Sequence, residues 1–95
     1  MEFLLSLAAK PQAKAQRLMS YLQREGPDLP RPYADVLRGK IRELRVGYGS
    51  LQLRFLYFFE AKSIVLVSGF LKKTSAVPEE EIVRAERRMM EWLNG

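Results

Sequence analysis

The sequence predicts an α+β domain in which helices flank a small antiparallel sheet. Segment 41–72 contains three runs rich in β-branched and aromatic residues, separated by short turns, which is typical of a three-strand meander. Apolar residues recur at helical spacing before and after this segment. A chain of 95 residues is long enough for one modest core, so we expect residues 1–95 to form a single domain.

The N-terminal quarter predicts a helix that ends at a glycine. Residues 3–7 are mostly apolar and fit either one helical turn or the stub of a strand. Pro11 suits the first position of a helix, and Gly26 followed by Pro27 ends it. The cations of this helix, Lys14 among them, are expected to form a solvated face or, alternatively, to rim an RNA groove. The apolar stripe comprises Ala15, Leu18, Met19 and Leu22.

Residues 27–40 are expected to form a loop, because three prolines in six residues discourage regular structure. Tyr33, Val36 and Leu37 are expected to anchor one helical turn within it. Gly39 marks the entry to the first strand.

A final helix is predicted from Pro78 to about Leu93. Its first turn holds three glutamates, residues 79–81, where the helix dipole favours negative charge. A metal site is less favoured, because consecutive helix positions point 100° apart and the chain has no histidine. The apolar stripe comprises Ile82, Ala85, Met89, Trp92 and Leu93.

The turns of the meander predict which strand residues share a face. A loop at 47–50 places Arg45 opposite Gln52 and Glu43 opposite Arg54. A turn at 60–62 places Ser68 opposite Arg54 and Phe70 opposite Gln52. The apolar face then comprises Leu44, Val46, Leu51, Leu53, Phe55 and Tyr57. The polar face comprises Arg45, Gln52, Arg54, Ser68, Phe70 and Lys72 around Glu43.

Positive charge is concentrated on the sheet. Segment 38–73 has eight basic and two acidic residues, a formal charge of +6, whereas the whole chain carries +5 with a pI near 9.8. Such a charge favours a polyanionic partner, most commonly nucleic acid. Alternatively, the face is an ordinary solvated one with a Glu43–Arg54 ion pair worth a few tenths of a kcal/mol. A single carboxylate does not neutralise several cations, and Phe70 among them offers a base-stacking surface, as single-stranded RNA requires.

Composition excludes several kinds of chemistry. The chain has no cysteine, which excludes disulfides and thiolate catalysis and fits a cytoplasmic protein. It has no histidine, which removes the usual general base and the commonest metal ligand. We find no glycine-rich phosphate loop, zinc spacing or Ser/His/Asp set, and expect neither metal nor cofactor. No apolar run approaches a membrane span, and no basic residues precede the apolar opening as they do in a signal peptide.

A cluster of cations can still catalyse RNA cleavage. Attack of a ribose 2′-OH on its own 3′-phosphate requires an aligned nucleotide and stabilisation of a doubly charged phosphorane, to which arginine is suited. The proton acceptor is harder to assign, because arginine does not readily lose its proton. Lys72 and Lys73 are candidates if neighbouring cations depress their pKa, and Glu43 is the alternative.

The chain resembles toxins of the RelE/ParE superfamily, specifically the phage-derived HigB-type branch. The resemblance covers most of the chain and rests on four segments: LMSYLQREGPDLPRP at 18–32, IRELR at 41–45, LRFLYFF at 53–59 and VSGFLKKTSAVP at 67–78. It implies a curved antiparallel sheet with helices packed on one face. It also implies metal-independent mRNA cleavage on the ribosome and an antitoxin, often of the helix-turn-helix type, encoded by an adjacent gene.

The resemblance and the charged face together yield a predicted site. We expect Arg45, Arg54, Lys72 and Lys73 to be catalytic. We expect Phe70, Gln52, Ser68 and Arg42 to contact RNA.

Two departures from the superfamily pattern keep alternatives open. Relatives often have histidine where this chain has Ser68, so a non-enzymatic ParE-like inhibitor of DNA gyrase and an inactive member both remain candidates. Relatives also usually carry a further strand before the segment matching residues 2–7. We therefore expect one edge of the meander, along 41–46 or 64–70, to be free for homodimer formation or for cover by an antitoxin.

Overall fold

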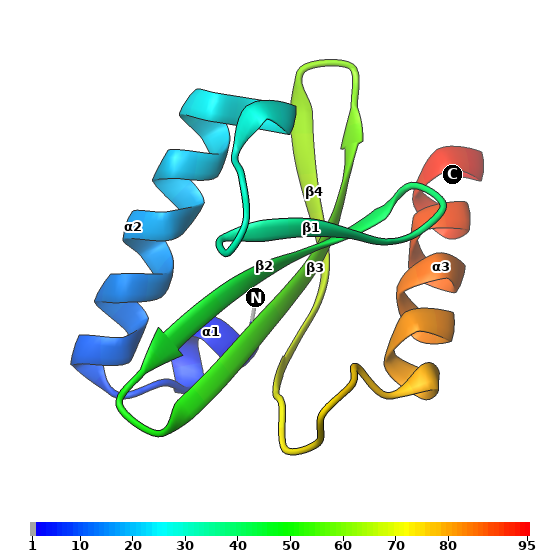
Figure 1. The fold of residues 1–95 in the computed structure, drawn as a ribbon. Coiled ribbons are helices and arrows are strands. Elements are labelled where there is room, and N and C mark those ends of the chain that lie inside the picture. Colours follow the sequence, from blue (N-terminus) through cyan, green and yellow to red (C-terminus); the bar gives the residue numbers. More distant parts are fainter. Residues whose placement is uncertain (1) are drawn as a thin grey trace.

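The computed structural model describes residues 2–95 and confirms the α+β class (Figure 1). Its strands form one antiparallel sheet in the order β1-β2-β3-β4. Among the described residues, no helix is both long and apolar enough to cross a bilayer. The elements are the helices α1 (Glu2–Ser6), α2 (Ala9–Glu25) and α3 (Glu79–Asn94), the 3-10 turn η1 (Gly26–Asp28), and the strands β1 (Ala34–Arg38), β2 (Ile41–Tyr48), β3 (Leu51–Glu60) and β4 (Ser63–Leu71).

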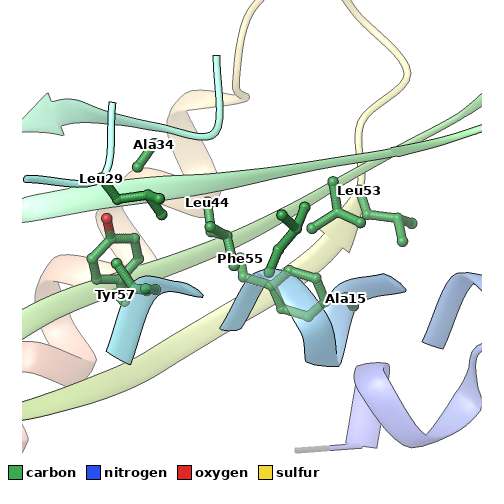
Figure 2. Close-up of a cluster of buried hydrophobic side chains, with 10 residues drawn as sticks. Ala15, Leu29, Ala34, Leu44, Leu53, Phe55 and Tyr57 are labelled. Carbon is green, nitrogen blue, oxygen red and sulfur yellow. The ribbon is translucent and has the colours of Figure 1, made fainter. Parts of the chain in front are cut away.

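Helix α2 covers one face of the sheet, and its predicted apolar stripe is the contacting surface (Figure 1). The helix begins two residues before Pro11, which still lies in the first turn where a missing N–H breaks no hydrogen bond. It ends at Gly26, whose φ of 57° lies in the region that favours glycine. Figure 2 shows strand residues of this core meeting Ala15 of α2. The buried members are Ala15, Leu18, Leu22, Leu29, Ala34, Leu44, Val46, Leu53, Phe55 and Tyr57.

Helix α3 lies on the opposite face, which corrects the expectation, implied by the resemblance, that the helices pack on one face (Figure 1). On this face Ile41 of β2 and Leu56 and Phe58 of β3 lie at one end of the strands, and the charged residues follow towards the β2–β3 turn. The apolar side chains form a second core with Val67 of β4 and Ala85 of α3. The charged residues are consequently confined to the part of the face that α3 leaves open.

Strand β1 was not predicted, because residues 27–40 were expected to be a loop with one helical turn. The last proline of the segment is Pro32, and the strand begins at Ala34. Only Ala34 is buried within it, and Val36 is 53% exposed, so an edge strand of this kind carries little hydrophobic pattern. Gly39, with a φ of 54°, turns the chain back into β2.

The β2–β3 register differs by two residues from the predicted one, and the β3–β4 register differs by two up to Leu56 and by one from Tyr57 to the turn. Gly49 has a φ of 58°, which permits a two-residue turn, so the strands extend to Tyr48 and Leu51. Arg45 therefore pairs with Arg54 instead of Gln52. Arg54 in turn pairs with Phe70 instead of Ser68. A shift of two leaves the side chains of β2 and β3 on their predicted faces, because the period of a strand is two.

Strand β4 contains an irregularity beside Leu56 and lies at the edge of the sheet. The register between β3 and β4 changes between Leu56 and Tyr57, so Val67 of β4 has no partner residue on β3. Val67 and the following Ser68 are both buried. Strand β1 covers the outer edge of β2, so within residues 2–95 the 64–70 run is the uncovered apolar edge. A cleft of about 560 Å³ follows this edge between α1 and α3.

Candidate anion-binding site

Four charged side chains lie together where β1, β2 and β3 run side by side. Asp35 pairs with Glu43, and Arg45 pairs with Arg54, so two carboxylates and two guanidinium groups share one face. The Arg45 Nε donates to the Glu43 Oε1 at 2.6 Å, and the Arg45 Nη2 lies 3.5 Å from the Asp35 Oδ2. Asp35 also accepts from exposed Arg31 at 2.6 Å, which holds the pKa of Asp35 below its ordinary value. Asp35 thus adds a second carboxylate to the one that the sequence places there.

Arg54 is the most deeply buried cation of this group. It is 7% exposed and Glu43 is 4% exposed, yet the Arg54 Nε and the Glu43 Oε2 are 3.9 Å apart. Neither atom has a hydrogen-bond partner among residues 2–95. The Arg54 Nη1 donates to the carbonyl of Leu53 at 2.9 Å. The guanidinium is thus buried with an unused donor and with only one nearby carboxylate.

Burial lowers the pKa of Arg54. The negative charge of Glu43 raises this pKa, and the positive charge of Arg45 lowers it further. A guanidinium has so high a pKa that it stays protonated at neutral pH in spite of this. Arg45 and Arg54 are neighbouring cations, and Arg54 lacks a full set of hydrogen-bond partners. Such a pair attracts an anion, because an anion offsets both the repulsion between the two cations and the cost of burying Arg54.

The two arginines open into a cleft of about 400 Å³ with a basic lining. It lies where the end of the β2–β3 hairpin approaches the first turns of α2 (Figure 1). Lys14 of α2 reaches across and donates to the carbonyl of Gly47. None of the lining residues, all within the described range, is acidic. They are Lys14, Leu18, Pro32, Tyr33, Arg45, Gly47, Gln52 and Arg54. We call this space the basic cleft.

The structure brings five of the predicted site residues to one end of the sheet. Arg45, Gln52 and Arg54 line the basic cleft. Phe70 pairs with Arg54, and the N–H of Lys72 donates to the carbonyl of Gln52 at 2.7 Å. Phe70 also packs against the second core. Lys73 follows directly and is exposed.

Two predicted residues lie apart from this group. Ser68 is buried beneath α3, where its hydroxyl donates to the Glu81 Oε1 at 3.1 Å. Arg42 belongs to the other face of the sheet, and its guanidinium lies 5.4 Å from the centre of the Phe59 ring. The alternation of β2 already separates Arg42 from Arg45, so the signal was present in the sequence.

Sequence reasoning missed Tyr33 and Asp35, and it assigned Lys14 no specific contact. Lys14 is one of several cations on α2, and only the packing of that helix along the hairpin selects it. Tyr33 and Asp35 fell within the expected loop. Recognising residues 34–38 as a strand would have placed Asp35 opposite a residue of β2.

Comparison with known proteins gives one match. The family described as "Phage derived protein Gp49-like (DUF891)" matches residues 2–90. No curated protein matches the chain significantly.

Proposed function

Because the chain belongs to the phage-derived Gp49-like family, we propose that it is the toxin of a type II toxin–antitoxin pair that cleaves mRNA on the ribosome. Family membership supports a toxin-like protein of the RelE type. The resemblance to the HigB-type branch supports the nuclease activity. The proposed partners are translated mRNA in the cytoplasm and a neutralising antitoxin, whose acidic residues would compete with RNA for Arg45 and Arg54.

The observation that carries this proposal is the basic cleft. It offers two neighbouring guanidinium groups, the ammonium group of Lys14 and no carboxylate in its lining. A phosphodiester is the ligand that matches such a set, because its two free oxygens accept bidentate hydrogen bonds from arginine. The Nε of Arg54 is buried and unpaired, 3.9 Å from the Glu43 carboxylate, so the charge of this guanidinium is incompletely offset within the protein.

The proposed reaction needs no group beyond the chain and its substrate. The ribose 2′-oxygen attacks the adjacent phosphorus and forms a 2′-O–P bond, and its proton passes to a base on the protein. The bond between phosphorus and the 5′-oxygen then breaks, and that oxygen takes up a proton. The products are a 2′,3′-cyclic phosphate and a 5′-hydroxyl. Arg45 and Arg54 stabilise the charge that accumulates on the phosphorane, and Lys72 or Lys73 moves the protons.

Expression of the chain in bacteria tests the proposal. The wild type should arrest growth and produce cuts in translated mRNA, which primer extension maps. Arg54→Ala should reduce cleavage about 100-fold or more, because a donor to the transition state is lost. Arg87→Ala changes an exposed arginine on α3 and should cleave as the wild type does. Since Arg54 is buried, Arg45→Ala provides a second, more exposed variant, and urea unfolding shows whether each variant is folded.

Two results would contradict the proposal. One is growth arrest by Arg54→Ala and Arg45→Ala as strong as that by the wild type. The other is inhibition of gyrase supercoiling by purified protein without any RNA cleavage, which would favour the ParE-like alternative.

A further inference from the structure

A second hollow adjoins the basic cleft and has a different chemical character. It has a volume of about 250 Å³ and is lined by Tyr21, Glu25, Leu29, Pro30 and Tyr33. Tyr33 lines both spaces, so its side chain forms the wall that they share. We call the second space the tyrosine hollow.

Tyr33 is both accessible and held in place. It is 45% exposed, whereas Phe55 and Phe58 are fully buried, so packing alone does not account for its position. The backbone is fixed on both sides of the ring. The carbonyl of Tyr33 accepts from the N–H of Arg45 at 2.7 Å, and its own N–H donates to the carbonyl of Pro30 at 3.0 Å. The hydrogen bond from Arg45 holds the backbone of Tyr33 beside that of a cleft arginine.

The lining of the tyrosine hollow suits a nucleobase better than a phosphate. Tyr21 is 42% exposed and contributes a second aromatic wall. Glu25 adds a carboxylate, which repels a phosphate but accepts hydrogen bonds from the N–H groups of a base. Cations that hold the backbone beside aromatic rings that stack on bases are the combination by which proteins bind single-stranded RNA.

We propose that Tyr33 is a base-stacking residue and that the tyrosine hollow receives the base next to the phosphate held in the basic cleft. This inference rests on the proposed function and deepens it, because it assigns the direction in which single-stranded RNA leaves the cleft. It also transfers the main stacking role from Phe70 to Tyr33. Phe70 packs against the second core, which leaves less of its ring for a base.

Binding of a fluorescein-labelled RNA of ten adenosines, followed by fluorescence anisotropy, tests the inference. Tyr33→Ala should weaken binding about fivefold to a hundredfold, as loss of one stacked base does. Tyr33→Phe should bind as the wild type does, because stacking needs the ring and not the hydroxyl. Tyr33→Leu keeps an apolar but shorter side chain without a ring and should bind as weakly as the alanine variant. Trp92→Ala removes an exposed aromatic from α3 and should leave binding unchanged.

A direct readout comes from Tyr33→Trp combined with Trp92→Phe, which leaves one tryptophan in the chain. Its fluorescence should be quenched when the RNA binds. Equal binding by the wild type, Tyr33→Ala and Tyr33→Leu would overturn the inference while leaving the proposed nuclease intact. Weak binding by Tyr33→Phe would also overturn it, because the hydroxyl would then be the group that matters. A folded wild type that neither binds this RNA nor cuts translated mRNA would refute the proposed function and this inference together.

Discussion

At the scale of single residues, burial separates the ion pairs that matter from those that contribute little. Arg31 is largely exposed, and its pair with Asp35 is screened by solvent. Glu43 and Arg54 are almost completely buried, so their charges interact strongly and are costly to leave unpaired. Arg45 is intermediate, with a side chain 35% exposed, and joins the buried pair to the open cleft. Glu43 therefore holds both arginines near the position where a phosphate would lie.

Replacing Glu43 with glutamine should destabilise the fold by about 3 kcal/mol, because Arg54 would then be a buried charge without a counter-ion. Urea unfolding followed by circular dichroism measures this change in the free energy of unfolding. Asp35→Asn is the matched control on the paired strand and should cost less, since solvent screens that carboxylate. A Glu43→Gln variant as stable as the wild type would show that Arg54 does not depend on this carboxylate.

At the scale of elements, α3 decides how much of the charged face stays open. Its stripe presents Ala85, which is fully buried against the second core. Polar contacts add to this at both edges of the helix. Ser68 donates to Glu81, and the Arg88 Nη1 donates to the carbonyl of Val67 at 2.6 Å. Two of the three glutamates of the first turn thus have separate partners, as Glu79 pairs with Arg38 at 2.5 Å, which lowers the pKa of Glu79.

Enlarging Ala85 should displace α3 from the sheet. Ala85→Leu adds volume where no space is available, and overpacking of this kind costs about 1–3 kcal/mol. Thermal unfolding should show a lower midpoint, and near-ultraviolet circular dichroism should show a changed environment for the aromatic residues. Arg87→Leu introduces the same side chain at an exposed position of the same helix and should leave both signals unchanged. An Ala85→Leu variant with the wild-type midpoint would contradict the close packing of α3.

At the scale of the whole molecule, the distribution of charge matters more than its total. The chain carries a formal charge of +5, and segment 38–73 alone carries +6. Folding adds Lys14 of α2 to the arginines of that segment. The outcome is one cleft with a basic lining that draws on elements distant in the sequence. A basic cleft attracts polyanions over a distance comparable to the Debye length, about 10 Å at 0.1 M salt.

The affinity for single-stranded RNA should therefore fall steeply with salt. Each phosphate neutralised contributes about −0.7 to the slope of log K against log salt. Lys14→Gln should make the slope shallower by about 0.7, whereas Lys62→Gln, at the tip of the β3–β4 hairpin, should not change it. Anisotropy titrations at several salt concentrations give these slopes. Identical slopes for the wild type and Lys14→Gln would exclude Lys14 from contact with the RNA backbone.

The sequence by itself determined the two long helices, the three long strands and the face on which the residues of β2 and β3 lie. Helices show a period near 3.6 and strands a period of two, and both are properties of short segments. The predicted faces of β2 and β3 remained correct although both turns were placed wrongly, because the register error was an even number of residues. Arg45 and Arg54 were therefore expected to share a face before their pairing was known.

Only the tertiary structure decided what surrounds those arginines. Strand β1 is short and mostly exposed, so its own sequence carries little hydrophobic pattern. Its pairing with β2 is what holds it in the strand conformation. That pairing brings Asp35 and Tyr33 to the site, and the packing of α2 brings Lys14. The packing of α3 covers Ser68 and keeps it away from the cleft. These outcomes depend on contacts between residues far apart in the chain, which local periodicity does not encode.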